Sequence, residues 1–296
     1  MKLLITGASG FIGSRLMSTA CAALGAENVI AFSSKPAHAC LAIVYYGPDF
    51  NLSAADHALL ATVEVLIHVG AFTPKNTLQA NAIKESNSNI GFTENLLALS
   101  FENLKKIIYI STVDVYEPAE LTDEATPTLP VSLYGCSKLY CERMTAIFAA
   151  NHHLVCQILR IGHVYGPGEE TYAKFLPKAI KNIVADQAVE LWGDGNEVRS
   201  FIYIDDVVTA ILQAVNLGED VGPINVVGGV PMTIRELLDE VIVVSGKSVA
   251  ITSKEFSGPK RNYVFDNAKL RQHLLPAETD LSTGLQAEYA YMAGLA

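Results

Sequence analysis

The sequence has no apolar run close to the ~20 residues that a helix needs to cross a bilayer. Its five cysteines are odd in number, and none has the CxxC or CxxH spacing of a metal site. Basic residues are in deficit, because 21 Lys and Arg stand against 31 Asp and Glu, for a net charge of −10. These absences argue against a disulfide framework, a metal, a nucleic acid or a membrane as partner. We expect a cytoplasmic protein, since the apolar segment that begins at residue 2 leaves no room for a signal peptide.

Short apolar segments alternate with longer helical ones through the first half of the chain. Strands are predicted at 2–6, 28–32, 41–46, 63–70, 105–112 and 154–161. Helices are predicted between them at 11–24, 52–62, 89–103 and 133–151. This alternation is typical of parallel βαβ units in a doubly wound sheet. After Gly166 the sequence is richer in loops, with helices predicted at about 173–186 and 233–245.

The turn after the first predicted strand is rich in glycine. In "LLITGASGFIGSRL" (3–16), Gly7, Gly10 and Gly13 let the backbone turn tightly and approach a pyrophosphate, which the next helix would bind through its N–H groups. An ordinary βα turn is the alternative, but the position after the first strand of a βαβ series favours dinucleotide binding. We expect Phe11 and Ile12 of the same turn to contact the cofactor.

These patterns together predict an α/β protein with a Rossmann-type, doubly wound parallel sheet and a smaller, mostly C-terminal α/β substrate lobe. Residues 1–165 and about 200–230 are assigned to the NAD(P)-binding domain, because 200–215 has the pattern of a strand entering a helix that could rejoin it. The remaining segments, about 166–199 and 231–296, are assigned to the substrate-binding lobe.

The end of the second predicted strand bears on which nicotinamide cofactor fits. NAD sites normally have an acid there for the adenosine ribose, whereas this sequence has Ser33, Ser34 and Lys35. Hydroxyls and an ammonium suit a 2′-phosphate, so we expect NADP in preference to NAD, unless these are ordinary turn residues. Asp49 is a candidate acceptor for the adenine amino group, with Phe50 beside it.

Tyr134 and Lys138 lie four residues apart in "YGCSK" (134–138), on one face of a predicted helix. The pair is either the first turn of an amphipathic surface helix or a proton-transfer device. A tyrosine acts near pH 7 only if its pKa falls below the usual value of about 10, and an ammonium or a cationic nicotinamide nearby favours the phenolate. Ser111 and Thr112 would add a hydroxyl at the carboxyl end of a predicted strand, where ligands bind in open α/β sheets.

Eight segments carry a resemblance to a known family. They are "TGASGFIG" (6–13), "HVGA" (68–71), "NIGFTENLL" (89–97), "STVDVY" (111–116), "YGCSK", "LRIGHVYGPG" (159–168), "GDGNEVRSFIYIDDV" (193–207) and "INVVGG" (224–229). In this order they resemble the extended short-chain dehydrogenase/reductases, and within them the NAD(P)-dependent epimerases and dehydratases of nucleotide sugars. The resemblance extends to about residue 275.

The resemblance implies hydride transfer between the nicotinamide and a sugar carbon. Thr112 would hydrogen-bond the reacting sugar oxygen, Tyr134 would be the general acid and base, and Lys138 would bind the nicotinamide ribose and lower the tyrosine pKa. Further implied cofactor contacts are Gly70, Ala71 and Asn89. The substrate contacts we expect are Thr73, Thr112, His163, Arg199 and Arg261. The arginines would bind the nucleotide diphosphate, unless Arg199 forms a surface ion pair with Asp194 or Glu197.

Several positions depart from the family pattern or leave alternatives open. Sugar dehydratases have a glutamate that abstracts the C5 proton where this chain has the shorter Asp114, after Val113, which cannot donate a proton. His163 replaces an asparagine and would either contact the substrate or pack inside. His68 is expected to cap backbone groups rather than act as a base. Family members commonly dimerise through two helices, so we expect a homodimer, although the same apolar residues would also serve as core.

We predict an enzyme that acts on a nucleotide sugar as a 4-epimerase, which retains its cofactor, or as a 4-ketoreductase, which releases it after each turnover. The missing acid at Ser33–Lys35 favours the reductase. The alternatives are an NADP-dependent reductase of a small carbonyl compound, a nucleotide-sugar 4,6-dehydratase and a non-catalytic NADP-binding regulator.

Overall fold

The computed structural model describes residues 1–35, 42–47, 50–172, 174–255 and 262–295. Contacts within the chain divide it into two units. Unit 1 comprises Met1–Glu117, Pro127–Ile161 and Val208–Ile224. Unit 2 comprises Pro118–Thr126, Gly162–Val207 and Asn225–Ala296.

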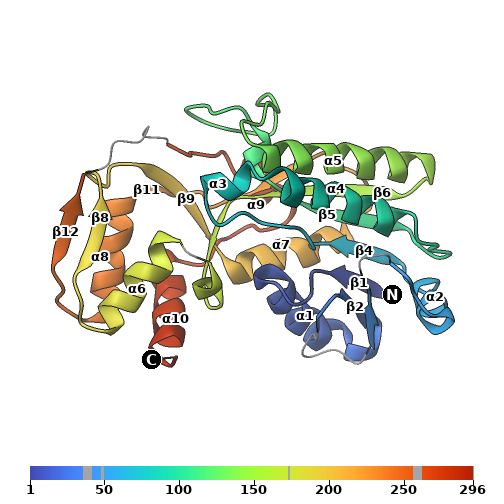
Figure 1. Cartoon of the computed structure of the whole chain (residues 1–296), viewed down its shortest axis with the longest axis horizontal. Helices are drawn as coiled ribbons and strands as arrows, with labels where there is room; N and C mark the ends of the chain where they lie inside the picture. The colour runs from blue at the N-terminus through green and yellow to red at the C-terminus, as the bar shows by residue number, and fades with distance from the viewer. Residues whose placement is uncertain (36–41, 48–49, 173, 256–261, 296) are drawn as a thin grey trace. The chain divides into compact units, whose positions relative to one another are not determined.

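A parallel sheet forms the centre of unit 1 (Figure 1). Its strands are β1 (Leu3–Thr6), β2 (Val29–Ser33), β3 (Ala42–Tyr45), β4 (Val65–His68), β5 (Lys106–Thr112), β6 (Val155–Ile161) and β10 (Ile224–Val226). Only the first residue of β10 belongs to unit 1, and the other two belong to unit 2. β1, β2, β4 and β5 are buried along their whole length, as strands covered on both faces must be. The predicted doubly wound α/β fold is confirmed.

The strand order places the candidate site. It is β10-β6-β5-β4-β1-β2-β3, so the chain builds outward in both directions from the pair β1 and β4. In that pair Thr6 lies opposite His68, at the carboxyl ends of both strands. Open α/β sheets bind ligands at such a topological switch point, beyond the carboxyl ends of the strands.

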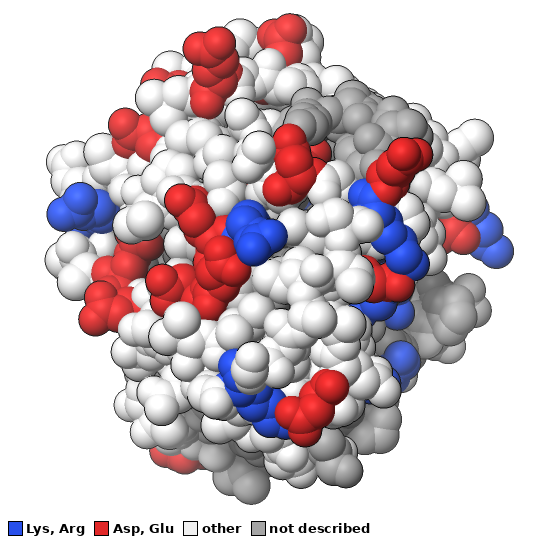
Figure 2. All heavy atoms as spheres, turned by 90° about the vertical axis from the view of Figure 1, so that its left-hand side faces the viewer, with Lys and Arg blue, Asp and Glu red and all other residues white. Residues whose placement is uncertain are grey.

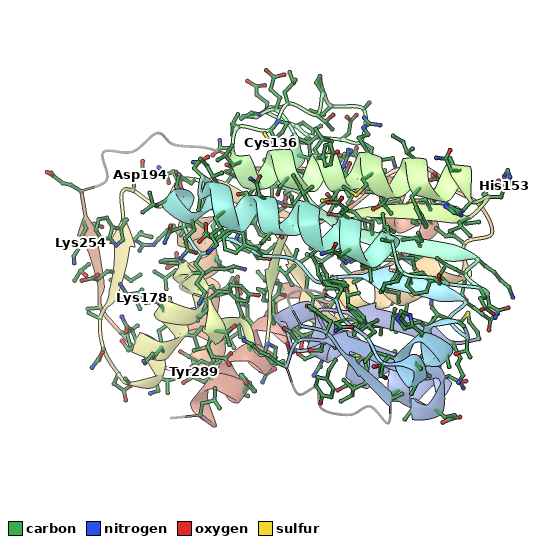
Figure 3. All side chains as sticks on the ribbon, turned by 45° about the vertical axis from the view of Figure 1, so that its right-hand side comes forward. Cys136, His153, Lys178, Asp194, Lys254 and Tyr289 are labelled. Atoms are coloured by element: carbon green, nitrogen blue, oxygen red, sulfur yellow. The ribbon has the colours of Figure 1, made fainter. Side chains whose placement is uncertain are left out.

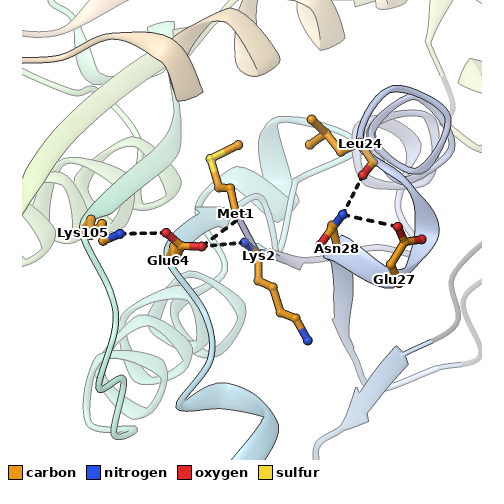
Figure 4. A network of polar contacts seen from close by, with 7 residues as sticks. All are labelled: Met1, Lys2, Leu24, Glu27, Asn28, Glu64 and Lys105. Atoms are coloured by element: carbon orange, nitrogen blue, oxygen red, sulfur yellow. Dashed lines mark hydrogen bonds and ion pairs between the residues drawn. The ribbon is translucent and has the colours of Figure 1, made fainter.

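Figure 4 shows how the opposite, amino-terminal edge of the sheet is held together. The Glu64 carboxylate accepts hydrogen bonds from the Lys2 backbone N–H at 3.2 Å and from Lys105 Nζ at 2.8 Å. The Met1 amino group lies 3.4 Å from the same carboxylate. The hydrogen bond from Lys105 lowers the pKa of Glu64. One carboxylate thus joins the starts of β1, β4 and β5, away from the edge that carries the polar residues of the site.

The helices of unit 1 are α1 (Phe11–Leu24), α2 (Ala54–Leu60), α3 (Thr77–Ala80), α4 (Ile83–Leu97) and α5 (Leu133–Asn151), and α7 (Ile204–Asn216) ends in it. α4 and α5 pack side by side (Figure 1). α5 begins at Leu133 because Ser132 Oγ accepts a hydrogen bond from the Gly135 N–H at 3.1 Å. The prediction for α4 was wrong at both ends, because the helix begins at Ile83 rather than at residue 89 and stops at Leu97.

Unit 2 has smaller sheets. The strand orders are β11-β9-β7 and β12-β8, with β7 (His163–Tyr165), β8 (Val189–Trp192), β9 (Val198–Tyr203), β11 (Pro231–Thr233) and β12 (Ile251–Lys254). Its helices include α6 (Phe175–Val184), α8 (Ile234–Ser245), α9 (Ala268–His273) and α10 (Leu281–Ala293). α6, α8 and α10 pack against one another. On the face shown in Figure 2, Lys and Arg side chains are interspersed with Asp and Glu. Among the described helices, none combines the length and the hydropathy that a membrane span needs.

Candidate active site

Tyr134 and Lys138 occupy the first two turns of α5, and both side chains are buried. Lys138 Nζ donates a hydrogen bond to the Ile110 carbonyl of β5 at 2.7 Å and lies 4.4 Å from the centre of the Tyr109 ring. Burial lowers the pKa of Lys138 to about 8, although nearby acidic groups favour its charge. The pair is therefore not the first turn of an amphipathic surface helix. Cys136, labelled near the start of α5 in Figure 3, is the exposed residue of this segment.

Thr112 is the last residue of β5 and caps the short helix η2 (Val113–Val115). Its Oγ1 accepts a hydrogen bond from the Asp114 N–H at 3.2 Å. The Asp114 side chain reaches solvent, yet the protein around the carboxylate desolvates it and raises its pKa, against the opposing effect of a hydrogen bond with Thr112. The end of β5 thus presents a hydroxyl and a carboxyl group that interact with each other.

Gly135 brings α5 close to that strand end. A Cβ at this position would overlap the Asp114 carbonyl oxygen and lie 2.8 Å from Pro130 Cβ. Only a residue without a side chain lets the first turn of the helix contact the backbone that follows Thr112, and Tyr134 is its neighbour in sequence. Gly135 is not among the predicted site residues, because a glycine after a tyrosine carries no signal of a close backbone approach.

A buried ion pair holds α5 against β6. Arg160 forms two hydrogen bonds with the Glu142 carboxylate, Nε to Oε1 at 3.0 Å and Nη2 to Oε2 at 2.8 Å. Arg160 Nη1 also donates to the Tyr116 hydroxyl at 2.8 Å. Glu142 is one turn beyond Lys138, so this bidentate pair fixes the helix that carries the lysine. Sequence reasoning missed the pair, whose only signal was an acid four residues after Lys138 and an arginine in a buried strand.

Asn89, on α4, holds the loop that follows β4. Its Oδ1 accepts from the Phe72 N–H at 2.7 Å, and its Nδ2 donates to the Phe72 carbonyl at 3.3 Å and to Ser137 Oγ at 3.2 Å. Gly70, Ala71 and Thr73 lie in the same loop. The structure therefore brings four of the predicted contacts into one group of residues, with Asn89 as the link between the loop and α5.

The glycine-rich turn has the geometry that a pyrophosphate requires. Gly7 has a φ of 68°, and a Cβ on it would lie 2.6 Å from Gly70 Cα. A Cβ on Gly13 would overlap the Gly7 carbonyl oxygen. Among the described residues no side chain caps the start of α1, where Gly10 is the N-cap and Phe11 and Ile12 follow. The turn offers a close backbone approach at a helix N-terminus, which suits the phosphates of a dinucleotide.

The polar groups at the end of β2 and just after it already have hydrogen-bond partners within the chain. Ser33 is buried, and its Oγ accepts from the Lys35 N–H at 3.2 Å. Ser34 hydrogen-bonds Tyr46, whose pKa is raised by burial. The Phe50 ring packs against Phe32, Tyr46 and Phe92, with ring centres 5.0 to 5.6 Å apart. Asp49 lies outside the described residues.

The predicted substrate contacts His163 and Arg199 lie in unit 2, on the neighbouring strands β7 and β9. The Arg199 guanidinium stacks on the Tyr263 ring at 4.7 Å, and the His163 ring meets the same ring edge-on at 5.5 Å. Arg199 also forms an ion pair with Glu197 at 3.0 Å, as the alternative interpretation expected. Burial, and then the charge of Arg199, lowers the pKa of His163 to about 3, so the ring is neutral. Arg261 lies outside the described residues.

Comparison with known proteins identifies the family. The model of the NAD dependent epimerase/dehydratase family matches residues 3–228. This chain belongs to that family. Its members named below act on nucleotide sugars, and the extended short-chain dehydrogenase/reductase resemblance is confirmed.

Individual members of the epimerase/dehydratase family match along the whole chain. Over 314 aligned residues, the chain is 29% identical to an uncharacterised UDP-glucose epimerase of Bacillus subtilis, covering 100% of this chain and 99% of the relative. It is 26% identical to a dTDP-glucose 4,6-dehydratase of Streptomyces griseus, covering 98% and 93%. The crystal structure of a UDP-glucuronic acid 4-epimerase from Bacillus cereus with UDP-glucuronic acid and NAD is 26% identical, with a TM-score of 0.83 and 100% of both chains covered.

Family membership makes this chain an enzyme of the NAD-dependent epimerase/dehydratase type. The expected preference for NADP finds no support, because the solved family member holds NAD. Within the part of the chain that the structure describes, no group of three or more His, Cys, Asp or Glu side chains could hold a metal ion.

Proposed function

We propose that this family member is a nucleotide-sugar 4-epimerase that works with NAD, with Tyr134, Lys138 and Thr112 as its catalytic residues. The observation that carries the proposal is the buried Lys138 ammonium one turn after Tyr134, on a helix that packs against the strand ending at Thr112. When bound, NAD supplies the acceptor and the donor of a hydride.

In the proposed reaction, the residues of this chain transfer the proton of the sugar hydroxyl and hydrogen-bond the sugar oxygen. Tyr134, as the phenolate, accepts the proton of the sugar C4 hydroxyl on oxidation and returns it to the same oxygen on reduction. The positive charge of Lys138 favours the phenolate, and the Thr112 hydroxyl hydrogen-bonds the sugar oxygen. Because the same groups serve both directions, inversion requires only that the sugar present its other face between the two steps.

The cofactor would lie along the carboxyl edge of the sheet in unit 1. Gly7, Gly10 and Gly13 would bind its pyrophosphate, and Lys138 would bind the nicotinamide ribose. We assign residues 1–165 and about 200–230 to this domain, and about 166–199 and 231–296 to the nucleotide sugar.

Two features of unit 2 suit a sugar nucleotide. His163 Nδ1 is buried and has no hydrogen-bond partner among the described residues, so a polar group of the substrate would satisfy it. The Arg199 guanidinium, 4.7 Å from the centre of the Tyr263 ring, would supply positive charge for a diphosphate. Arg261 and Thr73 remain proposed contacts.

The experiment that tests the proposal asks whether the purified enzyme converts UDP-sugars without added cofactor. We expect bound NAD to be released by denaturation, and UDP-glucose or UDP-glucuronic acid to equilibrate with its C4 epimer. Tyr134→Phe should lower kcat by at least about a hundredfold with NAD binding retained, since a positioned acid/base is worth that much. Tyr140→Phe, on the same helix with 57% of its surface exposed, is the matched control. Full activity of Tyr134→Phe would contradict the proposal.

A 4-ketoreductase is the second candidate, favoured by the absence of a carboxylate at Ser33, Ser34 and Lys35. It would release the oxidised cofactor after each turnover, so activity would depend strictly on added reduced cofactor. In that case the enzyme reduces a 4-keto sugar nucleotide and does not interconvert epimers. Cofactor binding without any turnover would instead support a non-catalytic regulator.

We also propose a homodimer formed through α4 and α5. Ile83 on α4 and Ile147 on α5 are exposed by 69% and 62%. Light scattering of the purified protein tests this, and a mass near the 31.8 kDa of one chain would contradict it.

A further inference from the structure

A continuous chain of buried hydrogen bonds crosses the carboxyl edge of the sheet in unit 1. The Gly70 N–H donates to Thr6 Oγ1 at 2.8 Å, and Thr6 Oγ1 lies 2.9 Å from His68 Nδ1. On the other side of the ring, His68 Nε2 lies 3.0 Å from Thr93 Oγ1, which donates to the Asn89 carbonyl at 2.8 Å. The side chains of Thr6, His68 and Thr93 are at most 2% exposed.

The direction of every hydrogen in this chain follows from its two ends. When the Thr93 hydroxyl hydrogen is assigned to the Asn89 carbonyl, the Thr93 oxygen accepts a hydrogen from His68 Nε2. A neutral imidazole protonated at Nε2 has a bare Nδ1, which accepts the Thr6 hydroxyl hydrogen. The Thr6 oxygen in turn accepts the Gly70 N–H. The other tautomer would place the Nε2 lone pair against the Thr93 oxygen, with no hydrogen between them.

Both ends of the chain reach groups that the proposed function uses. Gly70 touches the phosphate-binding turn, since a Cβ on it would lie 3.1 Å from the Gly7 nitrogen. Asn89 donates to Ser137 Oγ at 3.2 Å, and Ser137 Oγ donates to the Tyr134 carbonyl at 2.8 Å. The histidine therefore lies at the middle of the path that connects the glycine-rich turn with the first turn of α5.

We propose that His68 is a positioning residue whose Nε2-protonated, neutral ring fixes the backbone at Gly70 on one side and helix α4 on the other, and thereby sets the spacing between the cofactor turn and Tyr134. The role in turnover rests on the proposed function, whereas the tautomer and the role in cofactor binding do not.

The surroundings of the ring keep it neutral. Burial, and then the positive charge of Lys138, lowers the pKa of His68 to about 3. The Tyr109 ring meets the imidazole edge-on at 5.3 Å and Phe92 lies at the same distance, and neither of these two neighbours is an anion that would compensate a second proton.

Nitrogen-15 NMR of the histidine-labelled protein tests the tautomer directly. At pH 7 we expect one ring with a protonated Nε2 and a bare Nδ1 that is absent from the spectrum of His68→Asn. A ring protonated at Nδ1, or one that titrates between pH 5.5 and 8, would overturn the proposal. Neither the tautomer nor the titration measurement needs a sugar substrate, so this test remains valid even if the protein converts no sugar.

Two substitutions separate the effects of the two hydrogen bonds that the His68 ring makes with Thr6 and Thr93. His68→Gln keeps a donor near the Nε2 position for Thr93 and loses the acceptor for Thr6, whereas His68→Asn does the reverse. We expect His68→Gln to weaken NAD binding about tenfold, and His68→Asn to lower kcat about tenfold while NAD affinity stays within about twofold. His57→Gln, an exposed histidine on α2, should change neither quantity.

If NAD affinity and kcat fall equally in His68→Gln and His68→Asn, the cause is a general loss of packing and the proposal is overturned. Unchanged NAD affinity and kcat in both variants would also overturn it. If neither His68 variant folds, Thr93 supplies the test. Thr93→Ser keeps the hydroxyl and should leave the His68 nitrogen spectrum unchanged, while Thr93→Val removes it and should shift the Nε2 signal. An unchanged spectrum in Thr93→Val would contradict the assigned direction of the hydrogens.

Discussion

At the scale of single residues, the charge of Lys138 is the property on which the candidate site depends. Burial disfavours the ammonium, and the Ile110 carbonyl and the face of the Tyr109 ring favour it. Because the resulting pKa is about 8, modest changes around the amine alter its charge near neutral pH.

Replacing the Tyr109 ring tests this balance. Tyr109→Leu removes an attraction of about 0.5–1 kcal/mol for the ammonium, which corresponds to roughly half a pKa unit. Loss of an interaction that favours the charged form lowers the pKa of Lys138, so kcat/KM should begin its alkaline decline at a lower pH. Tyr109→Phe keeps the ring and should leave the profile in place. Coincident pH profiles of the leucine and phenylalanine variants would show that the ring does not act on the amine.

The sequence allowed candidate catalytic residues to be predicted, but not the residues that surround them. Thr112, Tyr134 and Lys138 stand in a recognisable pattern, and the structure brings the three to one strand end and one helix. The ion pair of Arg160 with Glu142 and the hydrogen bonds of His68 join residues far apart in sequence. Their partners are fixed by packing, which a pattern along one chain does not encode.

At the scale of elements, the position of α5 depends on a glycine at its first turn. A helix interior normally favours alanine over glycine by about 1 kcal/mol. At Gly135 the added Cβ would meet the Asp114 carbonyl and Pro130, so packing outweighs propensity there. Gly91, on α4, has open space around the same added atom.

The two glycines form a matched pair. Gly135→Ala should lower the free energy of unfolding by about 1–3 kcal/mol, because the helix must move away from η2. It should also reduce kcat at least about tenfold, because Tyr134 moves with it. Gly91→Ala should raise stability by up to about 1 kcal/mol and leave kcat unchanged. Urea denaturation and steady-state kinetics measure both, and a stabilised, fully active Gly135→Ala would refute the close-approach argument.

The misplaced start of α4 has a physical reason at this scale. Residues 83–88 are mostly polar and show no apolar stripe, so periodicity places the start of the helix too late. Ser86 and Asn89 on this helix are nevertheless buried, and Asn89 has partners in the loop after β4 and on α5. Hydrogen bonds to distant segments take the place of the apolar contacts that a sequence pattern detects.

At the scale of the whole molecule, two buried carboxyl groups in unit 2 make stability depend on pH. Glu169 and Glu288 are 2% and 1% exposed. Lys174 lies 2.8 Å from Glu169, and Glu288 interacts with the Glu169 carboxyl group and with the backbone at Gly166. Burial, and then the charge of Glu169, raises the pKa of Glu288 to about 9. Glu288 is therefore protonated in the folded protein at neutral pH, and Lys174 compensates the charge of Glu169.

This raised pKa fixes the sign of the pH dependence. The folded state binds one more proton than the unfolded state between the ordinary glutamate pKa of about 4.3 and the folded value of about 9. The contribution of protonated Glu288 to the free energy of unfolding is therefore fully present below pH 4, and it is lost as the pH rises toward 9. Glu288→Gln has the shape of the protonated side chain and no proton to lose.

The difference in Tm between wild type and Glu288→Gln reports on Glu288 together with its interaction with Glu169, because every other ionisable residue is common to both proteins. From pH 6 to pH 9 we expect the wild type to lose roughly 2–4 kcal/mol relative to the variant, a Tm difference of roughly 5–10 °C. Glu240→Gln, at an exposed position on α8, should give a curve parallel to the wild type. A curve for Glu288→Gln that also runs parallel would mean that Glu288 ionises without cost in the folded protein, and the account of a protonated buried carboxyl would then fail.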